Sequence, residues 1–256
     1  MARHLRFQNQ SEGNYYHVTA RGAGRRILFE DNGDRAEYLR LLRKFTAETT
    51  GEVLAWCLMG NHVHVLFRMD LHELSSLVHR LHTCYAQHFN GRHGHVGPVF
   101  QGRFDSKPVH TEEHLLSAVC YIHKNPVDLG IPDWWSYAWS SYQEFLSEAP
   151  SEGQRMILEL FGGADRFVSF HESEQVSEIA LGGYGRKVTD ADAENALIRL
   201  YGKHFSDALA TMPAKERAEA FARLHYTFNL SVRQIERLTG IGRNSIARAI
   251  ANFEKL

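Results

Sequence analysis

The sequence has few cysteines, no long apolar run and almost no net charge. Its three cysteines, Cys57, Cys84 and Cys120, stand far apart without a CxxC pair, which excludes a disulfide-stapled scaffold and favours buried thiols in a reducing cytosol. No run approaches the roughly 18 apolar residues that a membrane helix needs, and Met1–Gly13 is too polar for a signal peptide. With 43% hydrophobic residues, the chain can form a packed core. We therefore expect a cytoplasmic globular protein with no membrane partner.

The near-zero net charge hides an uneven distribution of charge along the 256 residues. Residues 1–145 are balanced and hold 13 of the 16 histidines. Residues 146–212 hold 6 basic and 11 acidic residues, whereas residues 213–256 hold 8 basic and 4 acidic residues. A basic end behind an acidic middle predicts separate modules, of which only the last indicates a polyanionic partner.

The N-terminal half predicts alternating strands and helices. Strands are expected at Tyr15–Arg21 and Phe104–His110, and a β-hairpin at Val53–Met59 and Val63–Phe67 around Gly60-Asn61. Apolar residues at helical spacing predict three helices. The first begins at an Asp34–Glu37 capping box, the second lies between the β-hairpin and a glycine- and histidine-rich loop at Asn90–Pro98, and the third runs from a Thr111 cap to Asn125-Pro126. This order predicts an α+β, ferredoxin-like antiparallel sheet with helices on one face.

The rest of the chain is expected to be all-α. Residues 147–153 resemble a linker, and residues 154–212 an acidic helical connector. Near the end, a Ser231–Gln234 capping box, a turn at Gly240–Gly242 and buried positions at Ile246, Ile250 and Phe253 predict a helix-turn-helix. Its outward positions are Arg243, Asn244, Ala247 and Arg248. A helical pair that only packs on its neighbour is the alternative. The expected domains are 1–146, 147–212 and 213–256.

Two histidines share one face of a predicted strand. His62 and His64 are two residues apart, so both imidazoles project to the same side while Val63 is directed behind them. Such a pair can hold a divalent cation, although an isolated HxH is also compatible with two half-exposed histidines on a sheet. A second HxH, His93–His95, lies in the predicted loop without a strand to orient its rings.

The third predicted helix carries a tyrosine outside its apolar stripe. Tyr121 and Asn125 are four residues apart and share a face. At about 100° per residue, Tyr121 lies about 150° from the stripe formed by the leucine, valine and isoleucine residues of this helix. A structural tyrosine is expected within the stripe, so Tyr121 is either merely exposed or functional.

Four ordered motifs resemble one protein family. They are Met59-Gly-Asn-His-Val-His64, Phe100-Gln-Gly-Arg-Phe104, Tyr121-Ile-His-Lys-Asn-Pro126 and Trp139-Ser-Ser-Tyr142. Together they resemble the single-tyrosine HUH transposases, particularly the REP-associated tyrosine transposases of bacteria, over about residues 14–145. The family usually has proline at the position of Gly60, a difference that removes no chemical group.

The resemblance implies a nuclease and strand transferase that acts on single-stranded DNA, at REP-like DNA hairpins. It implies that Tyr121 is the nucleophile, that His62, His64 and Asn125 bind Mg²⁺ or Mn²⁺, and that two copies can pair. The metal, Lys124 or His123 could assist deprotonation of the Tyr121 phenol, whose ordinary pKa is about 10.

The remaining candidates concern DNA contacts and competing functions. Arg21 and Arg103 are expected to contact phosphates, and Arg243, Asn244 and Arg248 to contact duplex or DNA-hairpin stems. A rolling-circle initiator or relaxase would use the same chemistry. A DNA-binding regulator with an inactive site is the alternative from another class. The resemblance implies a cytoplasmic, nucleoid-associated location.

Overall fold

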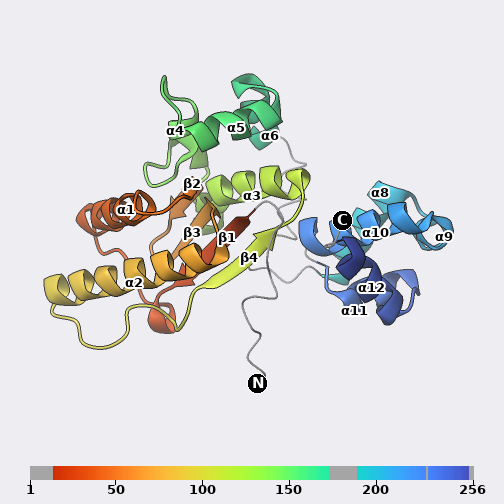
Figure 1. Cartoon of the computed structure of the whole chain (residues 1–256), viewed down its shortest axis with the longest axis horizontal. Helices are drawn as coiled ribbons and strands as arrows, with labels where there is room; N and C mark the ends of the chain where they lie inside the picture. The colour runs from red at the N-terminus through yellow and green to blue at the C-terminus, as the bar shows by residue number, and fades with distance from the viewer. Residues whose placement is uncertain (1–13, 173–188, 229, 254–256) are drawn as a thin grey trace. The chain divides into compact units, whose positions relative to one another are not determined.

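The computed structural model describes residues 14–172, 189–228 and 230–253. Contacts group the chain into one unit of residues 1–109 and 122–167 and a second unit of residues 110–121 and 168–256. Figure 1 shows the course of the chain through these elements. The domain boundaries expected from the sequence differ from this grouping and stay predictions.

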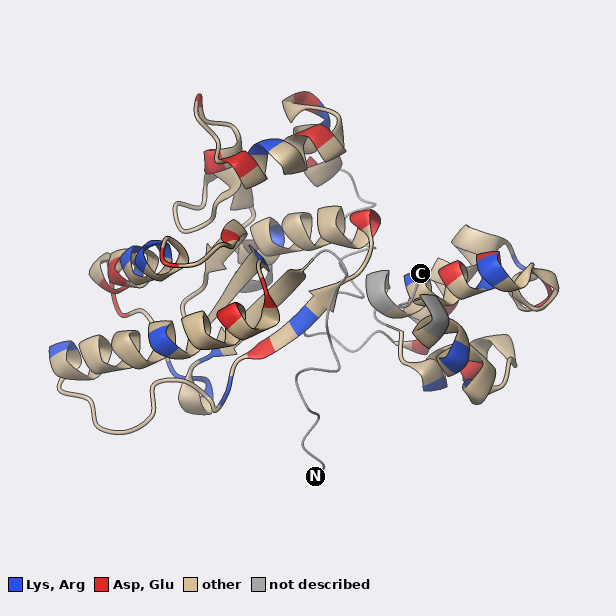
Figure 2. Cartoon of the chain, in the orientation of Figure 1, with Lys and Arg blue, Asp and Glu red and all other residues tan. Residues whose placement is uncertain are grey.

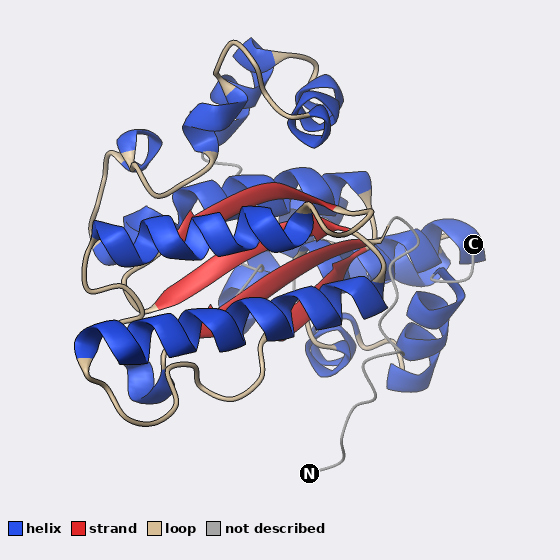
Figure 3. Cartoon of the chain, turned by 60° about the vertical axis from the view of Figure 1, so that its left-hand side comes forward, coloured by secondary structure: helices blue, strands red, loops and turns tan. Residues whose placement is uncertain are grey.

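The first unit is built on a four-stranded antiparallel sheet. Its strands are β1 (Tyr15–Arg21), β2 (Glu52–Leu58), β3 (His62–Arg68) and β4 (Asp105–Val109), in the order β2-β3-β1-β4. This is the ferredoxin-like order, and each strand agrees with its predicted position to within two residues. The helices α1 (Asn32–Thr46) and α2 (Leu71–His93) pack against each other and on the sheet (Figure 3).

The alternation of side chains along the strands divides the sheet into two faces. One face joins α1 and α2 in a single buried apolar cluster, to which β1 contributes Tyr16, Val18 and Ala20. Val63 and Val65 of β3 belong to the same cluster. The residues between them therefore point to the opposite face, and this places His62 and His64 away from the main core.

Helices and short turns follow the sheet in the chain. They are α3 (Glu112–Lys124), the 3-10 turns η3 (Asn125–Leu129) and η4 (Trp134–Ser136), α4 (Tyr142–Phe145), α5 (Glu152–Phe161) and α6 (Ala164–Glu172). Another 3-10 turn, η2 (Ala23–Arg25), follows β1. The predicted cap of α3 is confirmed, because the Thr111 hydroxyl accepts from the His114 amide at 3.0 Å. Its predicted end before Asn125-Pro126 is confirmed as well.

Three sequence expectations were wrong. The N-cap of α1 is Asp31, whose carboxylate accepts from the Asp34 amide at 3.1 Å; Asp34 itself lies inside the helix. Helix α2 continues to His93 and ends at Gly94, so half of the predicted loop is helical. The predicted linker contains the beginning of α5, where Ser151 and Gln154 form a capping box. For α1, the nearby Asp31 takes the capping position that the sequence analysis gave to Asp34.

The second unit has its own apolar core. It is formed by α8 (Asp190–Tyr201), α9 (Phe205–Thr211), α10 (Ala214–Ala222), the π-helical turn η5 (Arg223–Thr227), α11 (Val232–Thr239) and α12 (Arg243–Phe253). The expected helical character of residues 154–212 is thus confirmed for the described part, while residues 173–188 lie outside it. No helix among the described residues is both long and apolar enough to cross a membrane.

Candidate active site

The turn between β2 and β3 is held by backbone hydrogen bonds from the segment that follows β1. The Gly22 amide donates to the Asn61 carbonyl at 2.9 Å, and the Leu28 amide donates to the Gly60 carbonyl at 2.7 Å. Within the turn, the Met59 amide donates to the His62 carbonyl at 2.9 Å. The residues that lead into the two histidines are therefore fixed by main-chain contacts, which do not depend on the identity of the side chains.

His62 and His64 lie together on the face of β3 opposite α1 and α2. Their ring centroids are 5.1 Å apart, with the ring planes almost perpendicular. His64 is 2% exposed and His62 is half-buried. Burial, with smaller contributions from the neighbouring His17 and His62, lowers the pKa of His64 well below its ordinary value. His64 is therefore neutral at physiological pH, as a metal-binding imidazole must be.

Each of these histidines is hydrogen-bonded through Nδ1. His62 Nδ1 lies 2.8 Å from Asn61 Oδ1. His64 Nδ1 lies 2.9 Å from His17 Nε2 and 3.4 Å from Thr19 Oγ1. Such contacts restrict the rotation of both rings. His17 and Thr19 were missed in the sequence analysis, although the polar alternation of His17, Thr19 and Arg21 along β1 was a signal for them.

The other predicted metal ligand and the nucleophile belong to α3 and the turn that follows it. Tyr121 lies in the last turn of α3 and is half-buried. Asn125 begins η3 and is 3% exposed. Its side-chain amide oxygen is a hard ligand of the kind that Mg²⁺ and Mn²⁺ accept.

The two auxiliary candidates have different surroundings. His123 is fully buried, its Nε2 lies 2.9 Å from Ser141 Oγ, and its ring packs edge-on against Tyr142 and Phe145. This placement favours a structural role for His123 over the role of proton acceptor. Lys124 Nζ lies 5.7 Å from the centre of the Trp134 ring, a cation–π distance.

The donor set fits an exchangeable divalent cation. No cluster of three or more His, Cys, Asp and Glu side chains suited to a metal occurs among the described residues. The site predicted from the sequence consists of two imidazoles and an amide oxygen. Because it contains no thiolate and few protein ligands, it fits a Mg²⁺ or Mn²⁺ ion that keeps positions for phosphate oxygens better than a closed zinc site.

The arginines expected to contact DNA occupy separate parts of the first unit. Arg21 is exposed and pairs with His62 in the β1–β3 register, so it lies on the same sheet face as the two histidines. Arg103 is also exposed, but it lines a groove of about 720 Å³ between α2 and residues 98–104. Neither His62 nor His64 lines this groove. His82 and Phe100 stack at 4.0 Å between ring centroids among the residues that line this groove. Strand β4 carries one acidic residue, Asp105, and one basic residue, Lys107 (Figure 2).

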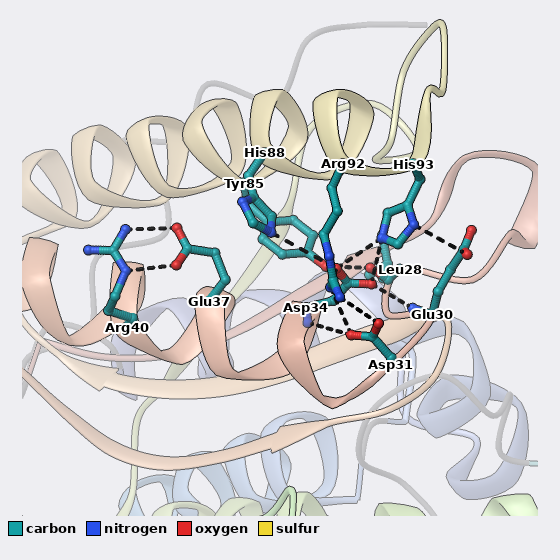
Figure 4. A network of polar contacts seen from close by, with 10 residues as sticks. All are labelled: Leu28, Glu30, Asp31, Asp34, Glu37, Arg40, Tyr85, His88, Arg92 and His93. Carbon is teal, nitrogen blue, oxygen red and sulfur yellow. Dashed lines mark hydrogen bonds and ion pairs between the residues drawn. The ribbon is translucent and has the colours of Figure 1, made fainter.

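The second predicted HxH is a structural element. His93 lies in the last turn of α2, and its Nε2 lies 3.0 Å from both carboxylate oxygens of the buried Asp34 (Figure 4). Arg92 pairs with Asp31 and Asp34, while His95 contacts Arg26. These contacts connect the end of α2 to the first turn of α1 and to the segment before it.

In the C-terminal helix pair, the buried and exposed positions agree with the sequence prediction where they are described. Gly240 caps α11 with a positive φ of 71°, and α12 begins at Arg243. Ile246 and Ile250 are buried, whereas Arg243, Asn244 and Arg248 are exposed. The side chain of Phe253 lies outside the described set. The Arg243 amide donates to the Glu236 carboxylate at 3.0 Å, which fixes the turn between the helices. Whether these helices read DNA stays a prediction.

Comparison with known proteins agrees with the motif analysis. Residues 10–125 match the family model described as "Transposase IS200 like". Over this segment the chain is similar to the IS200-like transposases. This match agrees with the resemblance inferred from the motifs that lie within it.

A solved structure is also similar to part of the chain. It is titled "Structure of the REP associates tyrosine transposase bound to a REP hairpin", with 18% sequence identity and a TM-score of 0.48. The match covers 60% of this chain and 90% of that one. No curated protein matches the chain.

Proposed function

We propose that the protein is a metal-dependent endonuclease and strand transferase that acts on single-stranded DNA. The observation that carries this proposal is the pair of imidazoles on β3, each hydrogen-bonded through Nδ1, within a segment similar to IS200-like transposases. Two oriented imidazoles on a rigid strand suit metal-assisted phosphoryl transfer better than they suit a purely structural site.

Tyr121 is the proposed nucleophile. Its phenol loses a proton, and the resulting oxygen attacks the scissile phosphorus as the P–O3′ bond breaks. The departing 3′ oxygen takes up a proton, leaving a free 3′-hydroxyl and a 5′-phosphotyrosyl enzyme. Attack by another 3′-hydroxyl then reverses the step and joins two strands. This linkage conserves the phosphodiester for rejoining, which hydrolysis by water does not.

His62, His64 and the amide oxygen of Asn125 are the proposed ligands of Mg²⁺ or Mn²⁺. When bound, the cation supplies electrostatic stabilisation to the non-bridging phosphate oxygens. Lys124 is the proposed side chain that favours the phenolate, because a nearby ammonium stabilises negative charge. Arg21, on the same sheet face as His62, is proposed to contact the DNA backbone.

The proposed substrate is a REP-like DNA hairpin with unpaired flanking nucleotides. This choice rests on the resemblance of the four motifs to REP-associated transposases. A basic, exposed face on α12 supports additional binding to duplex DNA through Arg243, Asn244 and Arg248. Pairing of two copies is part of the same proposal.

Covalent capture tests the proposal. Full-length protein is mixed with labelled single-stranded DNA hairpins from around its own gene and with Mn²⁺, then denatured and separated on a gel. The wild type should retain label at the mass of the protein, whereas Tyr121→Phe, His64→Ala and chelator-treated samples should not. Tyr15→Phe, a change in another half-buried tyrosine, is the matched control and should retain the label.

Three results would change the assignment. Label on Tyr121→Phe would mean that another residue is the nucleophile. DNA binding without any adduct would favour a regulator whose catalytic site is inactive. Cleavage of a nicking origin in preference to a REP-like hairpin would favour a rolling-circle initiator or relaxase.

A further inference from the structure

A row of polar side chains on β1 faces the two histidines of β3. His17 and Thr19 alternate with the buried apolar residues Tyr16, Val18 and Ala20, and they pair in the register with Leu66 and His64. Paired residues share a sheet face, so His17 and Thr19 lie on the side of the proposed metal site.

His17 contacts His64 directly and away from solvent. The two side chains are 1% and 2% exposed, His17 Nε2 lies 2.9 Å from His64 Nδ1, and the ring centroids are 5.0 Å apart. Thr19 Oγ1 lies farther from the same nitrogen, at 3.4 Å. A buried hydrogen bond of this length fixes the ring orientation of His64.

The contact also constrains the position of the proton on His64. A neutral imidazole has one N–H donor and one lone-pair nitrogen. If His64 Nδ1 donates to His17 Nε2, then His64 Nε2 has the lone pair and can bind a cation. If the direction is reversed, His64 Nε2 carries the proton and cannot. Metal ligation through Nε2 therefore requires His17 to accept through its own Nε2.

We propose that His17 is a positioning residue for the metal ligand His64, because it accepts the Nδ1 proton and thereby presents His64 Nε2 to the cation. The inference rests on the proposed function. Asn61 serves the neighbouring ligand in the same way, with its Oδ1 at 2.8 Å from His62 Nδ1. One acceptor from β1 and one from the β2–β3 turn thus orient the two imidazoles. Such partners typically change metal affinity by about 10- to 100-fold.

Manganese binding without DNA is the primary test. Free Mn²⁺ is measured by electron paramagnetic resonance as it is titrated into full-length protein. His17→Phe keeps a ring but removes the acceptor, and it should weaken Mn²⁺ binding by about 10- to 100-fold. His17→Gln restores an acceptor oxygen and should recover most of the affinity. His82→Gln is the matched control, since His82 is also partly buried and its Nε2 lies 3.3 Å from the Tyr38 hydroxyl.

A second measurement reads the tautomer itself and needs no variant of His17. Long-range ¹⁵N–¹H correlation spectra of the wild type, assigned by comparison with His64→Gln, should show the His64 proton on Nδ1 in the presence of Mg²⁺. A proton on Nδ1 agrees with donation to His17 Nε2, whereas a proton on Nε2 contradicts it. This readout also remains informative if His17→Phe does not fold.

The outcomes separate this inference from the proposed function. Unchanged Mn²⁺ affinity in a folded His17→Phe variant, or a His64 proton on Nε2, would overturn the role of His17 and leave the metal site intact. If the wild type binds no Mn²⁺, with or without a DNA hairpin, the metal-dependent function itself is wrong. Equal losses in His17→Phe and His17→Gln would mean that packing, and not the acceptor, determines the affinity.

Discussion

Replacement of Asp34 by alanine should destabilise the first unit strongly. Asp34 is fully buried and accepts hydrogen bonds from three donors (Figure 4). The Glu30 amide lies at 2.8 Å, Arg92 Nη1 at 2.6 Å and His93 Nε2 at 3.0 Å. The carboxylate thus connects the segment before α1 to the last turn of α2.

The expected loss of folding free energy follows from the hydrogen bond that each donor loses. Hydrogen bonds to a charged group contribute about 1.5–3 kcal/mol each, and a buried donor left without its partner costs about 1–3 kcal/mol. The Glu30 amide and His93 lose an acceptor away from solvent. Arg92 loses less, because its side chain is 38% exposed and still pairs with Asp31. Removal of one partner of a buried ion pair costs about 3–5 kcal/mol, and we expect Asp34→Ala to lie in this range.

Tryptophan fluorescence during guanidinium unfolding is the appropriate assay. All four tryptophans, at positions 56, 134, 135 and 139, belong to the first unit, so the signal reports on that unit. Glu37→Ala is the matched control in the same helix, because the Glu37–Arg40 pair lies at its surface and such pairs contribute only about 0.2–0.5 kcal/mol. A loss below about 1 kcal/mol for Asp34→Ala, equal to that of the control, would refute this reasoning.

The remaining predictions concern pH, a close backbone approach and DNA binding. Burial raises the pKa of Asp34, but hydrogen bonds from His93, the Glu30 amide and Arg92 outweigh it and lower the pKa overall; the stability difference between wild type and Asp34→Ala should therefore persist above pH 4 and shrink as the pH falls below it, in the same fluorescence assay. Gly22→Ala should destabilise by about 1–3 kcal/mol, because its added methyl group would meet the Arg26 carbonyl; Gly60→Ala, with open space at that position, is the control. Replacing Arg243 and Arg248 together by alanine should weaken duplex binding and reduce the slope of log affinity against log salt by about 2, whereas identical slopes in fluorescence anisotropy would exclude a role for α12. Arg103→Ala should weaken binding of single-stranded DNA and leave duplex binding unchanged, as measured by filter binding with both DNAs.

The sheet and the histidine pair could be predicted from the sequence because both depend on local periodicity. Alternation with a period of two defines β1 and β3 and puts His62 and His64 on one face without further information. The end of α3 could also be predicted from the local sequence, since the proline that follows Asn125 prevents continuation of the helix. The C-terminal helix pair was indicated by its Ser231–Gln234 capping box and by Gly240.

The partners of the site residues could not be predicted, because they depend on tertiary contacts. His17 is 47 residues from His64 in the chain, and their contact follows from a strand register that local patterns do not specify. Asp34 is a residue type that often caps helices, but its carboxylate accepts hydrogen bonds from Arg92 and His93 at the C-terminal end of α2. Asp31 then takes the capping role. Which of the two aspartates caps the helix thus depends on residues about 60 positions away in the chain, Arg92 and His93.

These contacts form one continuous support for the histidine pair. The end of α2 holds Asp34 and Glu30 through Arg92 and His93. The chain between β1 and α1 then fixes the β2–β3 turn through hydrogen bonds from Gly22 and Leu28. The same turn supplies Asn61 to His62, while β1 supplies His17 to His64. Because this support consists mainly of main-chain and buried polar contacts, it restricts the positions of the two imidazoles. A substitution at the end of α2 should therefore affect the proposed metal site through backbone displacement even though it touches neither histidine.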